Sequence, residues 1–267
     1  MNQKIILLTG GSAGIGKSIA DLLAQQGHTV YCGSRRTFQS TNHNIISVAM
    51  DVNSEEQTET VVNQIISEHG RIDAVICNAG NGIAGAIEDT DSQEVYYQFE
   101  TNFFGVTKTL RACLPIFRQQ GFGKIIVTSS VAGIVPIPFQ AYYSAVKAAL
   151  IAYVQALSLE VKGFGIQCCL LLPGDTKTEF TAARKFTKKS QDENSPYYQK
   201  TKKSVGRMEH DEQNGMSPLS VAKIAVRQIN RKNMSLIAVP GIGYKLTCWL
   251  FPMLPAKFRM WIVNILY

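Results

Sequence analysis

Short apolar runs alternate with helix-length amphipathic stretches along most of this 267-residue chain. The runs that we expect to form strands are 4–9, 28–33, 45–50, 72–78, 124–129, 166–172 and 236–239. The stretches that we expect to form helices are 15–26, 54–69, 92–119, 141–162 and 218–230. Such alternation is typical of a parallel sheet with helices on both faces, whose strands are almost entirely apolar. The sequence therefore predicts an α/β fold, a doubly wound parallel sheet of about seven strands.

Local signals refine two of these helices. Ser54 is suited to the N-cap of the 54–69 helix, and Gly70 is suited to its end. Pro115 should bend or interrupt the 92–119 helix near its end, because proline has no backbone N–H to donate.

No linker-like stretch or internal repeat divides the chain, so we expect a single domain over residues 1–267. Two additions are predicted, a polar insertion at 179–217 and an apolar C-terminal tail at 240–267. Nine Lys and Arg residues but only three acids lie between Lys177 and Arg207, in a chain of net charge +7. This basic segment fits either contact with anionic lipid or a phosphorylated substrate, or a solvated loop. No nucleic-acid partner is expected, since no aromatic-and-basic module accompanies the charge.

Composition argues against several other classes of protein. Hydrophobic residues make up 45% of the chain, enough for a sizeable core. The first apolar run, 5–8, is too short for a secretory signal. The six cysteines form no CxxC pair, which favours reduced thiols in a cytoplasmic protein. The four histidines lack ligand spacing, so no metal site is predicted.

The first predicted strand ends in a glycine-rich turn. The turn contains Gly10, Gly14 and Gly16, and the first predicted helix begins within it. Glycines permit a tight turn and a close approach of the backbone, and a helix N-terminus offers free N–H groups to a phosphate. The expected ligand is the pyrophosphate of a dinucleotide, as in a Rossmann fold.

Two arginines follow the second predicted strand. An NAD-selective site usually has an acid near this point, but here Ser34 occupies it and Arg35 and Arg36 follow. Arginine is suited to bidentate binding of a 2′-phosphate. The pattern predicts NADP(H) rather than NAD(H), and the alternative is two ordinary surface charges.

A tyrosine and a lysine stand four residues apart in the 141–162 helix. Tyr143 and Lys147 should share one helix face, whereas Tyr142 has Val146 at that spacing. A nearby ammonium stabilises phenolate, so Lys147 is predicted to lower the pKa of Tyr143 and make it a general acid or base. Taken alone, such a pair is also common on ordinary amphipathic helices.

Two serines end the strand predicted at 124–129. A hydroxyl at the carboxyl end of a parallel strand faces the crevice where α/β proteins bind ligands. Ser129 or Ser130 could therefore donate a hydrogen bond to a substrate carbonyl oxygen as charge develops on it.

Together these motifs resemble the short-chain dehydrogenase/reductase family, in its classical branch, from about Lys4 to Val239. The resemblance favours Ser130 over Ser129, because Ser130 lies thirteen residues before Tyr143. It adds Asn102 to the catalytic set of Ser130, Tyr143 and Lys147. The residues predicted to contact the cofactor are Gly10, Ser12, Gly14, Ile15, Gly16, Arg35, Arg36, Asp51, Val52, Asn78, Ala79, Gly80, Tyr143, Lys147, Pro173, Gly174, Thr176 and Thr178.

The resemblance implies hydride transfer between NADP(H) and a carbonyl or secondary alcohol. Ser130 would orient the carbonyl oxygen and Tyr143 would protonate it. Lys147 would hold the nicotinamide ribose, and Asn102 would position a water that relays protons. The family also implies a dimer or tetramer formed through the helices at 92–119 and 141–162.

The predicted substrate is a lipophilic ketone or alcohol. The apolar stretch at 135–139 would line its pocket, as in relatives resembling 17-beta-hydroxysteroid dehydrogenase, retinol dehydrogenases and acyl-dihydroxyacetone-phosphate reductases. The basic insertion makes the last type, with its acyl phosphate ketone, the main alternative. A catalytically silent nucleotide-binding regulator is disfavoured by the intact acid/base set. An epimerase or dehydratase of the extended branch is disfavoured by chain length and glycine spacing.

The tail at 240–267 has three basic residues and no acid. Pro252 and Pro255 divide it, and neither part reaches the roughly 20 apolar residues of a membrane span. Trp249 and Trp261 fit a peripheral membrane contact. A cover over the substrate pocket and a subunit interface are equally good interpretations.

Overall fold

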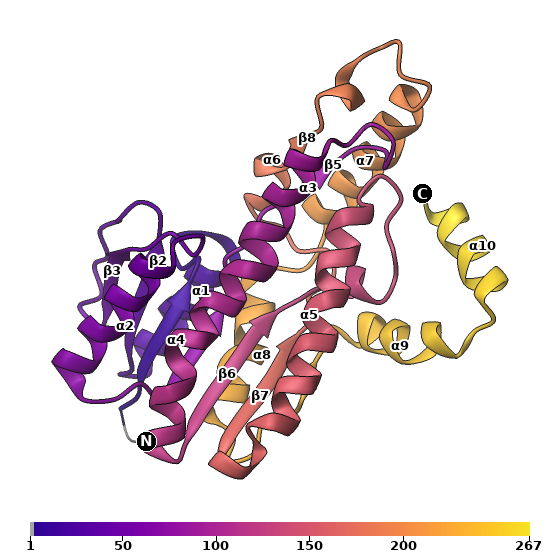
Figure 1. The fold of residues 1–267 in the computed structure, drawn as a ribbon. Coiled ribbons are helices and arrows are strands. Elements are labelled where there is room, and N and C mark those ends of the chain that lie inside the picture. The colour runs from indigo at the N-terminus through magenta and orange to yellow at the C-terminus, as the bar shows by residue number, and fades with distance from the viewer. Residues whose placement is uncertain (1–2) are drawn as a thin grey trace.

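A computed structural model describes residues 3–267. It contains a seven-stranded sheet in the order β3-β2-β1-β4-β6-β7-β9, and all neighbouring strands pair in parallel (Figure 1). The strands are β1 (Ile5–Thr9), β2 (Thr29–Ser34), β3 (Ile45–Ala49), β4 (Ala74–Cys77), β6 (Gly123–Thr128), β7 (Ile166–Leu171) and β9 (Ile237–Ala238). The predicted doubly wound parallel sheet is thereby confirmed.

Helices cover both faces of the sheet. These are α1 (Gly14–Gln25), α2 (Glu55–His69), α3 (Ser92–Phe99), α4 (Gly105–Gln120), α5 (Ala141–Glu160) and α8 (Pro218–Asn230). In β1, Ile5 and Leu7 pack with α2, α4 and α5, whereas Ile6 and Leu8 pack with α1 and α8. Successive residues of a strand face opposite sides of the sheet, so the core consists of two apolar clusters, one on each face.

The strand order reverses between β1 and β4: β2 and β3 follow β1 on one side, and β4, β6, β7 and β9 follow on the other. Thr9 at the end of β1 lies in register with Gly33 of β2 and Cys77 of β4. In an open α/β sheet, ligands bind outside the carboxyl ends of the strands at such a point. The fold therefore places the glycine turn after β1 beside the turn that follows β4.

The helix predicted at 92–119 is divided, but not at its proline. A π-helical segment, Glu100–Phe104, separates α3 from α4, whereas α4 continues through Pro115 to Gln120. The predicted late interruption at Pro115 is therefore wrong. A π-turn widens the helix by one residue per turn and is often found at functional sites. It contains Asn102, one of the predicted catalytic residues.

The insertion and the tail are both largely helical (Figure 1). The insertion contains α6 (Phe180–Ala183), α7 (Tyr198–Gln213) and β8 (Lys185–Phe186), which pairs with β5 (Ile83–Ala84). The tail contains α9 (Ile242–Leu250) and α10 (Ala256–Leu266), which lie to one side of the sheet. The sequence did not predict these elements. Within residues 3–267, no helix is both long and apolar enough to cross a membrane.

Candidate active site

A cavity of about 1120 Å³ opens at the carboxyl ends of the strands. All of the predicted site residues line it except Gly16 and Asn102, which are buried just behind its wall. The sheet supplies the turns after β1, β2, β3, β4, β6 and β7, and α5 supplies Tyr143 and Lys147. Residues of α7 and of the tail close the other side. The fold thus gathers side chains that are far apart in the sequence.

The glycine turn leaves no room for side chains. Gly10 has φ +70° and Gly14 has φ +54°, a region that L side chains rarely adopt. A Cβ at Gly16 would lie 2.0 Å from the carbonyl oxygen of Gly10. The α1 helix begins here with no side-chain cap, because its N-cap residue is Ala13. Its first N–H groups are therefore free for an anion, and the turn fits the pyrophosphate of a dinucleotide.

Thr9 fixes the glycine turn against the turn after β4. Its hydroxyl accepts hydrogen bonds from the backbone N–H groups of Asn78 (3.1 Å) and Ala79 (3.2 Å). The Asn78 amide donates to the carbonyl oxygen of Gly10 at 3.2 Å. This role of Thr9 was not predicted from the sequence, although a hydroxyl residue at the end of β1, directly before the glycine turn, could have indicated it.

Arg35 and Arg36 are exposed at the rim of the cavity, next to the end of β2. In the part of the chain that the structure describes, neither forms an ion pair with an acidic side chain. Ser34, in the position where an acid would indicate NAD, donates its hydroxyl to the Arg36 carbonyl oxygen at 2.6 Å. Both guanidinium groups are thus available to an anionic ligand.

Tyr143 and Lys147 lie together on the cavity side of α5. The ammonium group of Lys147 is 5.6 Å from the centre of the Tyr143 ring and donates to the Thr128 carbonyl oxygen at 3.0 Å. Burial lowers the pKa of Lys147 to about 8. Burial also raises the pKa of Tyr143 to about 12, although its hydrogen bond with Ser130 and the charge of Arg184 act in the opposite direction.

The pKa of Tyr143 therefore moves opposite to the direction predicted from the sequence. The loss of hydration outweighs the hydrogen bond with Ser130 and the charge of Arg184, and the Lys147 ammonium donates to the Thr128 carbonyl oxygen. A protonated phenol is the form that can donate a proton to a carbonyl oxygen.

The two candidate serines make different contacts. The Ser129 hydroxyl is buried and donates to the Lys147 carbonyl oxygen at 2.8 Å. The Ser130 hydroxyl accepts from the Ala132 N–H at 3.1 Å and makes only a long contact of 3.4 Å to the Pro173 carbonyl oxygen. A ligand carbonyl oxygen in the cavity could replace this long contact and the interaction of Ser130 with Tyr143, whereas Ser129 holds α5 against β6.

Asn102 is buried in the π-helical segment between α3 and α4. Its amide N–H groups donate to the Asn81 side chain at 2.6 Å and to the Gln98 carbonyl oxygen at 2.8 Å. Its carbonyl oxygen, Oδ1, is buried with no hydrogen-bond partner, and a Cβ added at Gly80 would lie 2.8 Å from it. A buried acceptor without a partner is costly unless a water or another donor reaches it.

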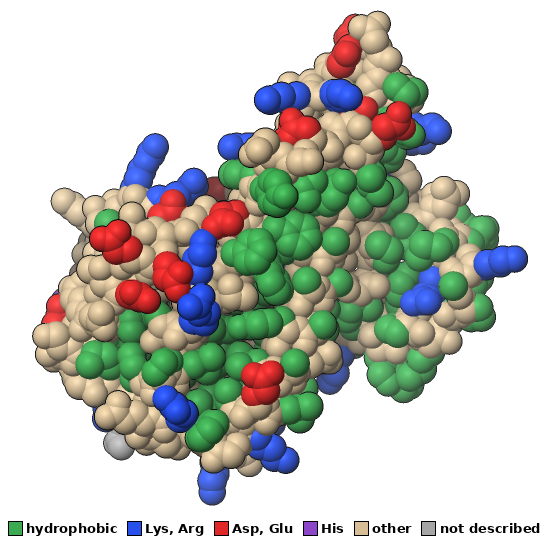
Figure 2. Space-filling view, viewed as in Figure 1, with side chains coloured by type: hydrophobic (Ala, Val, Ile, Leu, Met, Phe, Trp, Pro, Cys, Tyr) green, Lys and Arg blue, Asp and Glu red, His purple; other side chains and the backbone are tan. Residues whose placement is uncertain are grey.

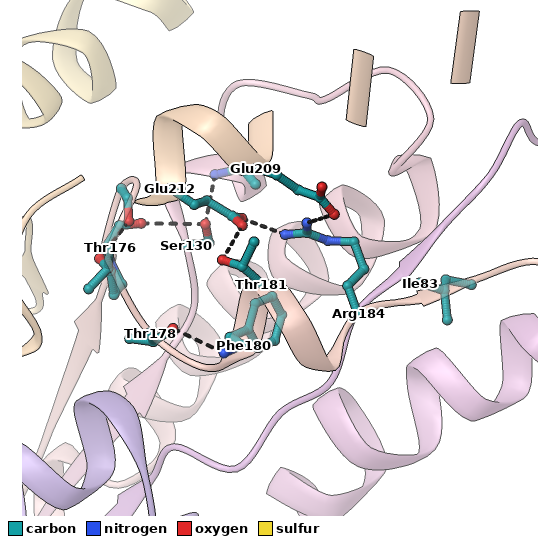
Figure 3. Close-up of polar contacts among 12 residues, drawn as sticks. Ile83, Ser130, Thr176, Thr178, Phe180, Thr181, Arg184, Glu209 and Glu212 are labelled. Carbon is teal, nitrogen blue, oxygen red and sulfur yellow. Dashed lines mark hydrogen bonds and ion pairs between the residues drawn. The ribbon is translucent and has the colours of Figure 1, made fainter. Parts of the chain in front are cut away.

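The wall of the cavity that comes from the insertion is held by an ion-pair cluster that no sequence motif indicated. Arg184, whose side chain is 1% exposed, contacts Glu212 at 2.5 Å and Glu209 at 3.6 Å. Glu212 also accepts a hydrogen bond from Thr181 at 2.6 Å. Figure 3 shows both carboxylates turned from α7 toward Arg184. In the sequence, Arg184 looks like one more charge in a basic run.

Comparison with known proteins identifies the class. The pattern of the family described as short chain dehydrogenase matches residues 4–189. The chain belongs to this family, in its classical branch. It is therefore an NAD(P)-dependent oxidoreductase that acts on CH–OH or C=O groups.

Individual relatives narrow the comparison further. The chain is 41% identical to 3-ketodihydrosphingosine reductase of Bacteroides thetaiotaomicron, over 87% of this chain and 86% of the relative. It resembles the crystal structure of a short-chain dehydrogenase from Streptomyces avermitilis with a TM-score of 0.84 and 27% identity, over 94% of each chain. ElxO with NADP bound is 26% identical with a TM-score of 0.75, over 92% of this chain and 100% of ElxO.

Proposed function

We propose that this protein reduces a long-chain ketone with NADPH, and that Ser130, Tyr143, Lys147 and Asn102 carry the catalysis. The cofactor would bind along the glycine turn and supply the hydride. The observation that carries the proposal is the joint placement of Tyr143, Lys147 and the Ser130 hydroxyl in one cavity with that turn. Residues 1–267 act as a single cofactor-binding domain in this proposal.

The four side chains would divide the proton chemistry. Ser130 donates a hydrogen bond to the carbonyl oxygen of the substrate, which becomes more basic as the bond to carbon is reduced. Tyr143 transfers its phenolic proton to that oxygen. Lys147, charged below its pKa of about 8, stabilises the phenolate left behind. The free Oδ1 of Asn102 accepts a hydrogen bond from a water that returns a proton through Lys147.

The preference for NADP(H) rests on Arg35 and Arg36. Their alanine variants should lose about 1.5–3 kcal/mol of NADPH binding energy per charged hydrogen bond removed. NADH lacks the 2′-phosphate, so its affinity should change much less. Fluorescence titration of R35A/R36A with both nucleotides measures this, and the exposed Arg118, which lies away from the cavity, provides the control variant R118A. Equal losses for the two nucleotides would contradict the assignment.

The charge on the insertion side of the cavity favours an amino ketone over an acyl phosphate ketone, and the lining cations Arg35, Arg36 and Lys147 belong to the proposed cofactor and catalytic sites. Asp175, Asp211 and Glu212 line this side of the cavity. The structure describes all nine basic residues from Lys177 to Arg207, and of these only Arg207 lines the cavity. Glu212 is paired with Arg184, so Asp175 and Asp211 contribute negative charge with no cation within ion-pair distance among residues 3–267. An ammonium group is attracted to this environment and a phosphate is repelled.

The relative from Bacteroides thetaiotaomicron is named for a substrate that fits this environment. 3-Ketodihydrosphingosine has an ammonium group on the carbon beside its carbonyl and a long saturated chain. The apolar side chains of Val135, Ile137 and Phe180 line the same cavity and could contact such a chain. We therefore favour a long-chain amino ketone over the acyl phosphate ketone of the main alternative.

Substrate competition tests this choice. NADPH oxidation should show a higher kcat/KM for 3-ketodihydrosphingosine than for an acyl-dihydroxyacetone phosphate of equal chain length. Replacing Asp211 with Asn should reduce kcat/KM for the amino ketone by about tenfold, the effect of one lost charged contact. D192N removes an acid of the insertion that does not line the cavity and should have no such effect. A preference for the acyl phosphate would overturn the amino ketone assignment.

The expected dimer or tetramer remains a proposal. Tyr96 of α3, Phe104 of the π-helical segment and Leu159 of α5 are exposed large apolar residues on the helices predicted to form the interface. Figure 2 shows apolar side chains across this side of the molecule. Exposed apolar area of this kind is typical of a protein–protein contact.

A further inference from the structure

The C-terminal tail exposes more apolar surface than its neighbours can cover. No residue of α9 is buried, and Val263 is the buried residue of α10. The exposed large apolar side chains of the tail are Ile242, Leu246, Trp249, Leu250, Met253, Phe258, Met260, Trp261, Ile265 and Leu266. Figure 2 shows apolar side chains over much of the visible tail, which projects beside the body of the molecule. An apolar patch of this extent marks a contact with a partner or a membrane.

The exposed side chains follow helical spacing. Ile242, Leu246, Trp249 and Met253 recur every three or four residues and so form one row, in which Ile242 is 82% and Trp249 61% exposed. Tyr244, Cys248 and Phe251 form the opposite row, which is partly or fully buried against the body. The outer row is therefore a second apolar face, separate from the one that attaches the tail.

The second helix of the tail repeats this arrangement. Phe258, Trp261 and Ile265 share its exposed face, and the rings of Phe258 and Trp261 stack with their centres 5.4 Å apart. On the other side, Val263 is buried and Arg259 lies over the ring of Phe251. Both helices of the tail thus have an outer apolar face that contains a tryptophan.

The charge around these faces identifies the partner. Lys245 and Lys257 are exposed beside the two outer faces, and residues 240–267 contain no acid. Tryptophan prefers the boundary between lipid headgroups and acyl chains, and lysine is attracted to anionic headgroups. Helices with an apolar face and flanking basic residues lie in the plane of a membrane surface. A protein interface of ordinary composition would instead be depleted of lysine.

The inner side of the tail reaches the catalytic cavity. Leu266 and Tyr267 line the cavity, and Tyr267 packs against the small apolar cluster formed by Ala84 with Val205 and Met208 of α7. The side chain of Arg207 donates to the carbonyl oxygen of Ile265 at 3.4 Å. The end of α10 therefore has one side on the cavity and one side on the exposed apolar face.

We infer that the outer face of the tail binds an anionic lipid bilayer and that a long-chain ketone passes from this bilayer past Leu266 into the cavity. The second half of this inference rests on the proposed reduction of a long-chain ketone. A substrate with a long acyl chain resides in membranes. If one wall of the cavity also contacts the membrane, the substrate can enter the cavity without passing through water.

Vesicle binding tests the inference directly. The full-length protein should sediment with vesicles of phosphatidylserine and phosphatidylcholine, and more weakly with phosphatidylcholine alone. W249S/W261S and K245E/K257E should each reduce this binding by about tenfold or more. F122S/L219S replaces two exposed apolar residues outside the tail and should bind as the wild type does. Equal binding by the wild type and both tail variants would overturn the inference.

Activity measurements separate this inference from the proposed function. W249S/W261S should lose kcat/KM for a ketone held in vesicles and retain it for a short-chain ketone dissolved in water. A protein that reduces neither ketone but still binds anionic vesicles would overturn the proposed function and leave the membrane contact intact. If the tail instead joins two copies of this chain, W249S/W261S would change the oligomeric state in analytical ultracentrifugation, and vesicle binding by the wild type would be absent.

Discussion

Replacing Tyr143 with Phe is expected to lower kcat by about 10³-fold, because the variant has no proton to give to the carbonyl oxygen. The change removes one hydroxyl and keeps the ring that packs at 5.8 Å against Phe180. The fold and the binding of NADPH should therefore be unchanged. Burial raises the pKa of Tyr143 to about 12, so the phenol is protonated in assays near neutral pH.

The neighbouring tyrosine provides a matched control. Tyr142 lies one residue earlier on the same helix but does not line the cavity. Y142F should retain wild-type kcat, and NADPH titration should give the same affinity for both variants. Pre-steady-state measurement of NADPH oxidation shows whether the chemical step itself is slowed in Y143F. Normal turnover by Y143F, or an equal loss in Y142F, would remove Tyr143 from the mechanism.

Replacing Arg184 with Met should have the largest effect on stability. Arg184 is 1% exposed, whereas its partners Glu212 and Glu209 are 14% and 32% exposed. Removing one partner of a buried ion pair costs about 3–5 kcal/mol, and solvent at the two carboxylates should place R184M at or below the lower end of this range. Since the pair joins α6 to α7, the loss should fall on residues 179–217. Denaturant unfolding measures the change in free energy of unfolding, and hydrogen exchange shows whether the insertion opens first.

An exposed pair gives the scale for comparison. Arg111 contacts Glu55 at 3.2 Å, but their side chains are 70% and 46% exposed, so R111M should cost at most about 1 kcal/mol. Adding E212Q to R184M removes one stranded carboxylate and should recover part of the stability. Equal unfolding midpoints for R184M and R111M would show that the Arg184 cluster is not a buried ion pair in solution.

The sheet and the main helices follow from local sequence signals. Apolar runs specify strands that are covered on both faces, and the helix predicted at 218–230 has the bounds of α8, where the structure shows Ser217 at the N-cap and Pro218 in the first turn. Ser54 and Gly70 likewise cap the ends of α2 as predicted. These signals lie within a few residues of the element that they define.

The features that the sequence did not reveal depend on contacts between distant segments. The π-turn at Glu100–Phe104 places Asn102 against Asn81, which no local pattern indicates. The burial of Arg184 depends on the position of α7. The raised pKa of Tyr143 depends on how completely the folded chain excludes water from it. The spacing of residues along the sequence predicted which side chains would lie together, whereas the exposure of each side chain to water depends on how the whole chain packs.

Tyr244 joins the tail to the turn after β7, which contains Pro173 and Gly174, two of the residues predicted to contact the cofactor. Its hydroxyl donates to the Asp175 carboxylate at 2.6 Å and accepts from the Asp175 N–H at 3.1 Å. Its ring lies so close to Gly174 that a Cβ there would come within 2.3 Å of it. A ligand that orders this turn also orders the tail, and coupling between two binding events is reciprocal. If the cofactor raises the affinity of the tail for its partner by some factor, the partner raises the affinity for the cofactor by the same factor.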